Sequence, residues 1–63
     1  MEKDLKNVGF SVSTYNALCR AGYTNLEELK GKTMKELFRI RNLGKKGVDE
    51  IVQVCSQHGI EIE

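Results

Sequence analysis

The residues best suited to chemistry lie in one short stretch, where small and basic side chains precede the last helical pattern of the chain. The stretch reads Ile-Arg-Asn-Leu-Gly-Lys-Lys-Gly over positions 40–47. Asn and Gly accept left-handed backbone angles, so this composition predicts a tight turn. At the start of the next helix the first N–H groups have no intrahelical acceptor and carry the positive end of the helix dipole. The layout predicts a helix-hairpin-helix element that binds phosphate.

The glycines and lysines of this hairpin have separate expected roles. Gly44 and Gly47 lack the side chain that would keep a phosphate away from the backbone, while Lys45 and Lys46 would add charge-assisted contacts. Lysine at a helix N-terminus opposes the macrodipole and costs up to about 1 kcal/mol, and a bound phosphate would reverse that sign. The alternative is a plain tight turn, in which the acidic pair at 49–50 offsets the lysines.

Charge is unevenly distributed along the chain, although the net charge is only +1. Seven of the ten basic residues fall between positions 30 and 46, with one acid, Glu36, among them: Lys30, Lys32, Lys35, Arg39, Arg41, Lys45 and Lys46. A one-sided positive field is typical of a surface that binds a polyanion. A solvated basic surface explains the same charges. In a further alternative, an acidic protein partner docks on four of them, Lys30, Lys32, Lys35 and Arg39.

Four short helices are expected to position these residues, so the predicted fold class is all-α. Ser11 is a candidate N-cap for the first helix, Thr24 or Asn25 begins a capping-box pattern for the second, and Thr33 with Glu36 repeats it for the third. The expected helices cover, in order, positions 12–20, a short segment with Leu26 and Leu29 that ends at Gly31, a short segment with Met34, Leu37 and Phe38, and positions 45–57.

Apolar spacing predicts which helix faces are buried. In the first helix one face is expected to carry Val12, Tyr15, Leu18 and Cys19, and the solvent face to carry Ser13, Asn16, Ala17 and Arg20. In the last helix the stripe comprises Val48, Ile51, Val52 and Cys55. An N-terminal arm at 1–10 and a tail at 60–63 are expected to fold onto the core through Leu5, Val8, Phe10, Ile60 and Ile62. Both cysteines are expected to be buried, reduced thiols rather than a disulfide or metal ligands.

Several function classes are disfavoured by composition. Sixty-three residues suffice for one domain. There is no apolar run of the roughly 20 residues that a membrane span needs, and no signal-peptide pattern, so a cytoplasmic protein without a membrane partner is expected. Two cysteines and His58 cannot complete a zinc site. No nucleophile–base motif occurs and the sequence is too short for the usual pocket, so no enzyme, cofactor or small-molecule substrate is expected.

Four stretches together resemble the C-terminal domain of the bacterial RNA polymerase α subunit. They are Ser-Thr-Tyr-Asn-Ala-Leu at 13–18, Arg-Ala-Gly at 20–22, Leu-Glu-Glu-Leu at 26–29 and Arg-Asn-Leu-Gly-Lys-Lys at 41–46. The resemblance runs from about position 5 to 59. It implies a compact bundle of four helices with a non-standard N-terminal turn. It also implies binding to the minor groove of A/T-rich promoter DNA and contacts with activators and the σ factor in the bacterial nucleoid.

The resemblance also implies a DNA surface at positions 13, 16, 17 and 19 of the first helix and 44, 46, 47 and 50 around the hairpin. Four of these residues match the family pattern: Asn16, Gly44, Lys46 and Glu50. Three differ, because Ser13 replaces an arginine that enters the minor groove, Cys19 replaces a basic residue and Gly47 replaces a serine. Asn7 and Gly9 also replace acids that face σ. These differences leave two possibilities, an α subunit domain and a divergent paralogue.

Serine supplies no cation to a narrow A/T-rich minor groove, so DNA binding is expected to be weak, salt-sensitive and poorly selective. Arg20 lies on the same helical face as Ser13 and would compensate in part. The residues expected to contact DNA are Ser13, Asn16, Ala17, Arg20, Gly44, Lys45, Lys46, Gly47 and Glu50. The alternative is a protein-interaction module that kept the fold but lost most specific DNA binding.

Overall fold

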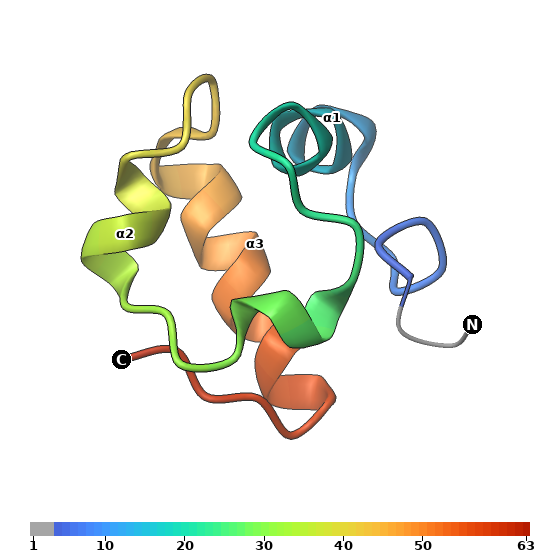
Figure 1. Ribbon diagram of the computed structural model, residues 1–63, viewed down its shortest axis with the longest axis vertical. Helices are drawn as coiled ribbons and strands as arrows, with labels where there is room; N and C mark the ends of the chain where they lie inside the picture. The colour runs from blue at the N-terminus through green and yellow to red at the C-terminus, as the bar shows by residue number, and fades with distance from the viewer. Residues whose placement is uncertain (1–3) are drawn as a thin grey trace.

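The computed structural model describes residues 4–63, and these residues form three α-helices and one short 3₁₀ helix (Figure 1). The helices are α1 (Val12–Arg20), η1 (Leu26–Leu29), α2 (Met34–Phe38) and α3 (Gly44–Gln57). Within the described residues no β-strand forms, and a single bridge joins Asp4 to Asn25. The predicted all-α class is confirmed.

The expectation of four helices needs a correction at the second one. Between Asn25, which is extended, and Gly31, whose φ is +86°, only the four residues of η1 take helical angles. This length is too short for a run of α-type hydrogen bonds, so the segment closes with i to i+3 bonds instead. The predicted capping box is present, because the Asn25 side chain accepts from the Glu27 amide at 2.8 Å and the Glu28 carboxylate accepts from the Thr24 and Asn25 amides. These backbone hydrogen bonds lower the pKa of Glu28.

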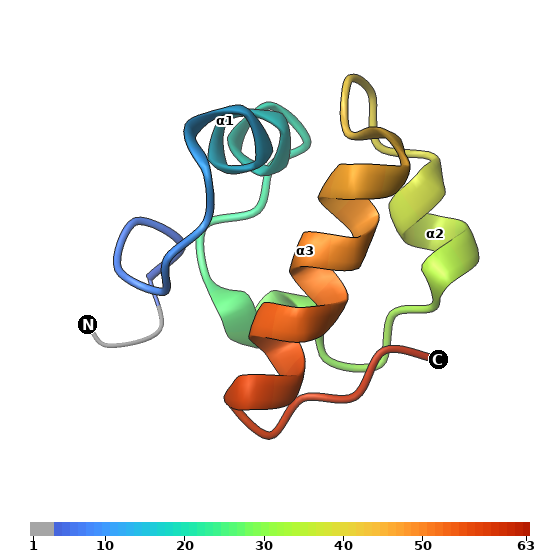
Figure 2. The same ribbon diagram turned by 180° about the vertical axis from the view of Figure 1, so that it is seen from behind.

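The core lies where α3 packs against both α1 and α2, with η1 alongside its lower half (Figures 1 and 2). The buried stripe of α3 is Val48, Ile51, Val54 and Cys55. Val54 therefore takes the place predicted for Val52, which is only half-buried. Leucines from the segment before α1, from α1, η1 and α2, and from the turn before α3 complete the core: Leu5, Leu18, Leu26, Leu29, Leu37 and Leu43.

The predicted buried face of α1 is wrong by a rotation of the helix. Thr14, Ala17 and Leu18 are buried, an i, i+3, i+4 set that fits a helix equally well. Val12 is 75% exposed, Cys19 is exposed and Tyr15 is half-buried. The physical reason is that α1 meets α3 through small and polar groups, so a count of large apolar side chains selects the wrong side.

The two ends of the described residues fold onto the core as expected. Leu5 is buried, and Val8 and Phe10 pack against the core, while positions 1–3 of the predicted arm lie outside the described residues. In the tail, Ile60 is buried and its amide donates to the Cys55 carbonyl at 2.8 Å. The Glu63 amide donates to the Lys32 carbonyl at 3.2 Å.

The cysteine prediction is half right. Both thiols are reduced, and Cys55 is buried, which raises the pKa of its thiol to about 11. Cys19 is exposed, because it lies on the outer side of α1 after the rotation described above.

Candidate nucleic-acid interface

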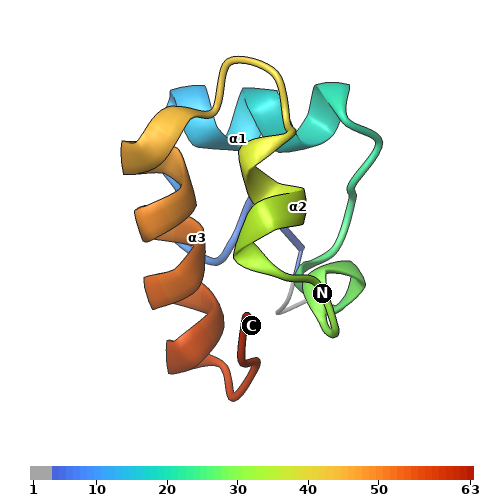
Figure 3. The same ribbon diagram turned by 90° about the vertical axis from the view of Figure 1, so that its left-hand side faces the viewer.

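The connection between α2 and α3 is a tight turn with two residues in the left-handed region. Asn42 has φ +65° and Gly44 has φ +69°, as the composition of the turn predicts. The turn lies at one end of the molecule, beside α1 and far from the C-terminus (Figures 1 and 3). The first residue of α3 is Gly44, one position earlier than predicted.

The start of α3 presents positive character to its surroundings. Its N-cap residue is Leu43, whose side chain has no atom that can accept a hydrogen bond from the first amides, and its first turn contains no acid. Lys45 and Lys46 are exposed there. A Cβ added at Gly44 would have no atom within 4 Å, so the space above this residue is open. These features fit a site where an anion can approach backbone N–H groups.

Gly47 has a different role from the one predicted. It is buried, and an added Cβ would lie 2.6 Å from Cδ1 and 2.8 Å from Cγ of Leu43. The missing side chain therefore makes room for Leu43 inside the hairpin. The prediction that Gly47 opens the backbone to a phosphate is not supported by this packing.

The α1 side of the interface contains three of the four residues expected on its surface. Ser13, Asn16 and Arg20 are exposed, whereas Ala17 is 3% exposed and packs into the core. Helical spacing predicts Ala17 on the solvent face, and that prediction is wrong. Its small side chain still shapes the surface, because it lines a hollow at the end of α1.

Glu50 joins α3 to the start of α1, the two helices of the candidate interface. Its carboxylate, on α3, accepts hydrogen bonds from the Ser11 amide (2.5 Å), the Ser11 hydroxyl (3.0 Å) and the Thr14 hydroxyl (2.6 Å). Burial alone would raise the pKa of Glu50, but these hydrogen bonds outweigh it and lower the pKa. A carboxylate at the N-terminus of α1 also complements the dipole of that helix. Glu50 therefore fixes the position of α1 against α3.

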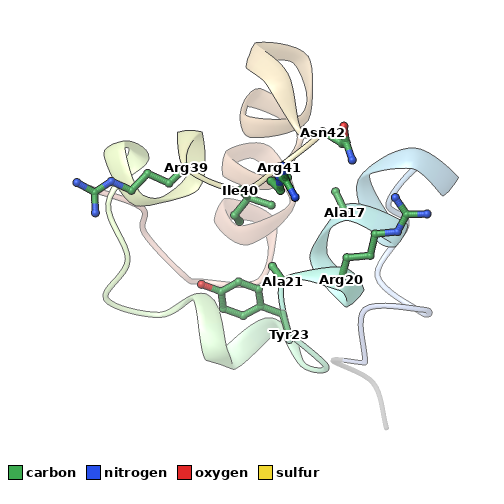
Figure 4. A pocket seen from close by; sticks show the side chains of 8 residues that line it. All are labelled: Ala17, Arg20, Ala21, Tyr23, Arg39, Ile40, Arg41 and Asn42. Carbon is green, nitrogen blue, oxygen red and sulfur yellow. The ribbon is translucent and has the colours of Figure 1, made fainter.

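The hollow, of about 460 Å³, lies between the end of α1 and the turn before α3 (Figure 4). Arg20 and Ala17 border it on the α1 side, and Arg41 and Asn42 border it on the side of the turn. The guanidinium of Arg39 is directed away from it. The complete lining is Ala17, Arg20, Ala21, Tyr23, Arg39, Ile40, Arg41 and Asn42. Sequence patterns do not predict this hollow, although Arg41 and Asn42 belong to the hairpin motif.

The remaining basic residues form a separate band. The band comprises Lys30, Lys32, Lys35 and Arg39. These residues lie between the end of η1 and the end of α2 in the sequence, before the turn. Lys32 is half-buried and the other three are exposed. Two large apolar side chains of α2 are also exposed, Phe38 at 51% and Met34 at 37%. Lys30, Lys32 and Lys35 are thus outside the lining of the hollow, whereas Arg39 lines it together with Arg41.

Comparison with known proteins decides the family. Residues 1–57 match the family of C-terminal domains of the bacterial RNA polymerase alpha chain. The protein belongs to this family. The resemblance predicted from the hairpin and α1 stretches is therefore confirmed, and the tight turn and α1 described above are features of an α C-terminal domain.

Three relatives, each named "DNA-directed RNA polymerase subunit alpha", illustrate the similarity. The protein of Clostridium perfringens (strain 13 / Type A) is 36% identical over 62 residues, covering 98% of this sequence. That of Clostridium kluyveri (strain ATCC 8527) is 35% identical over 63 residues, covering 100%, and that of Symbiobacterium thermophilum is 37% identical over 62 residues, covering 98%. The α C-terminal domain described here spans 20% of the length of each of these relatives.

Two further features of the described residues bear on the site. None of their helices is both long and apolar enough to cross a membrane. Among residues 4–63, no group of three or more His, Cys, Asp or Glu side chains is placed to hold a metal ion. The chemistry at this end of the α C-terminal domain is that of backbone amides, lysines, arginines and hydroxyls.

Proposed function

We propose that this protein is a non-catalytic, DNA-binding domain of a bacterial RNA polymerase α subunit or of a paralogue. It would bind the backbone of upstream promoter DNA in the bacterial nucleoid. The observation that carries the proposal is the uncapped start of α3, where exposed Lys45 and Lys46 follow an open Gly44. Helix N-termini of this kind favour phosphate, and the two lysines add charge.

The contribution of α1 is to bring polar and cationic groups alongside the hairpin. Ser13, Asn16 and Arg20 are exposed on α1, and Glu50 ties that helix to α3. We assign direct contacts to these three residues and to Gly44, Lys45 and Lys46. We propose that three other residues support this surface without contacting DNA. Ala17 is buried, and Gly47 makes room for Leu43. Glu50 accepts a hydrogen bond from Thr14 and so holds α1 against α3.

The proposed preference for A/T-rich DNA is weak. A narrow A/T-rich minor groove attracts an inserted cation, and the resemblance implies an arginine at the position of Ser13. A serine hydroxyl carries no charge, so most of the affinity would come from phosphate contacts. Such contacts are insensitive to sequence and fall steeply with salt.

The proposal is tested by fluorescence anisotropy with a duplex DNA at several salt concentrations. Lys45→Ala with Lys46→Ala should weaken binding and reduce the slope of log K against log salt concentration by about 1 for each lysine that contacts a phosphate. The matched control is Lys30→Ala with Lys35→Ala, which removes the same charge from the band. Equal effects of the two variants, or no binding by the native protein at low salt, would refute the proposal.

Ser13→Arg tests the minor-groove part separately. Restoring a cation at this position should tighten binding to an A/T-rich duplex more than to a G/C-rich one, by roughly 1–3 kcal/mol in the favourable case. Ser13→Lys is the control for charge without the planar guanidinium. An unchanged ratio of the two affinities would remove the groove contact from the proposal and leave only the phosphate contacts.

A second candidate function is docking of an acidic protein partner, such as another polymerase subunit or a transcription regulator. It is favoured by the band, because exposed Phe38 and Met34 lie among its cations and would give a partner apolar contact as well as charge. Reversing Lys32 and Lys35 to Glu should then abolish capture of the partner, while reversing Lys45 and Lys46 should not. The opposite pattern would favour DNA.

A further inference from the structure

We propose that the hollow bordered by Arg20 and Arg41, named here the arginine hollow, is a second site for a DNA backbone phosphate. This inference rests on the proposed DNA-binding function and adds Arg41 and Asn42 to the residues assigned there. The first site, at the start of α3, uses Gly44, Lys45 and Lys46. The second uses two side chains that come from different elements, Arg20 from α1 and Arg41 from the turn.

The location of the hollow connects it to the first site. Asn42, on its rim, is two residues before Gly44, and Arg20 is one helical turn from Asn16 on the exposed side of α1. Figure 4 shows Ala17 and Arg20 on the α1 edge of the hollow and Arg41 on the edge of the turn, with the Arg20 guanidinium extending outward, away from Arg41. A duplex that lies across α1 and the hairpin would therefore pass over its mouth.

The chemistry of the lining favours phosphate. Guanidinium groups present N–H donors in a planar fork that matches phosphate oxygens. Ala17, Ala21 and Ile40 also line the hollow, and their side chains do not compete for those donors, whereas Tyr23 adds a hydroxyl. At about 460 Å³ the hollow can accept a phosphate with its sugar, because the two alanines leave the space open. Asn42 on the rim adds an amide that can donate to a phosphate oxygen.

The second site would also explain how the protein binds DNA without an arginine at position 13. Cations at the hairpin and at the arginine hollow would contact two points of the backbone. Neither contact reads a base, so the arrangement would recover affinity without recovering selectivity.

The first test removes the charge. Arg20→Ala with Arg41→Ala should weaken binding on the order of tenfold and reduce the salt slope by about 1 for each arginine in contact. The control, Lys30→Ala with Lys35→Ala, removes the same charge at two exposed lysines that do not line the hollow. Circular dichroism checks that both variants fold. If the two variants bind DNA equally well, the arginine hollow is not a phosphate site.

The second test blocks the hollow without changing charge. Ala21 is exposed at the end of α1 with φ −80° and ψ −2°, which leucine can adopt. Ala21→Leu should therefore fold, fill part of the hollow and weaken DNA binding several-fold. Native affinity in this variant would overturn the proposal, because it would mean that the arginines act only through diffuse charge.

The DNA-binding function and the second phosphate site are distinguished by these variants. Loss of binding in the Lys45/Lys46 variant but not in the Arg20/Arg41 variant would keep the DNA-binding function and remove the second site. Absence of DNA binding by the native protein would remove both. Binding of a polyglutamate peptide that depends on Arg20 and Arg41, with DNA binding unaffected, would assign the hollow to an acidic protein and overturn the phosphate proposal.

Discussion

Among the residues expected to contact DNA, Glu50 has a carboxylate that joins two helices of the protein. It accepts three hydrogen bonds from Ser11 and Thr14. Thr14 is 3% exposed, and its burial is tolerable because Glu50 satisfies its hydroxyl. A periodicity analysis cannot find this pair, since the two residues are 36 positions apart and neither is apolar. This is why helical spacing predicts the ends of α1 correctly and its buried face wrongly.

Glu50→Gln is expected to reduce stability in a pH-dependent way. The folded-state pKa of Glu50 lies below its ordinary value of 4.5, so the carboxylate stabilises the fold above that value. This contribution is lost as the pH falls through the folded pKa. At pH 7 the variant should lose about 1–2 kcal/mol, since hydrogen bonds to charged groups are among the stronger ones.

Thermal unfolding followed by circular dichroism at pH 7 and pH 3 measures this effect. The native protein and the variant should differ at pH 7, by several degrees in a domain of this size, and the difference should be smaller at pH 3. Glu61→Gln is the control, because Glu61 is exposed in the tail. An equal difference at both pH values would show that Glu50 acts through packing rather than charge.

The hairpin shows how far a motif predicts an element. Its composition correctly predicts left-handed residues at Asn42 and Gly44, because few other residue types accept these angles. The capping patterns likewise predict where η1 and α2 begin. The motif does not reveal that Gly47 accommodates Leu43, since this contact depends on the path of the turn. The arginine hollow escapes prediction for the same reason, because Arg20 and Arg41 meet only after the turn and α1 are placed.

Gly47→Ala is expected to destabilise the protein by about 1 kcal/mol. Alanine gains up to about 1 kcal/mol of helix propensity, but its Cβ would overlap Leu43, and overpacking typically costs about 1–3 kcal/mol. In a Leu43→Ala background the overlap disappears, so the same change should become stabilising. Urea unfolding of the four proteins in this cycle measures the coupling. Additive effects would show that Leu43 is not what requires a glycine here.

The free energy of unfolding of the whole molecule is expected to be small. A domain of this size buries only about 60% of its unfolded surface, so each core residue matters. The tail is part of that core, because Ile60 is 4% exposed although it follows the last helix. The alternation of apolar and acidic residues at 60–63 is enough to predict that the tail folds back. It does not predict the Glu63–Lys32 hydrogen bond, which depends on the position of the η1–α2 connection.

Ile60→Ala should lower the free energy of unfolding by about 2–4 kcal/mol. The change removes buried apolar atoms, and the surrounding core can fill the resulting cavity only in part. Ile62→Ala, at a half-buried position, should cost clearly less. Chemical denaturation of both variants makes the comparison. Equal losses would mean that the tail acts as a unit rather than through Ile60.

The unequal environments of the two thiols provide a reporter for future measurements. At neutral pH a maleimide dye should react with Cys19 and spare Cys55, which is buried and has a thiol pKa of about 11. Cys19 precedes Arg20 on α1 but lines a different hollow, with Tyr15 and Tyr23, so the dye would be attached on the neighbouring side of α1 with no engineered residue. Its emission would then register, in the native sequence, the arrival of whatever occupies that end of the molecule.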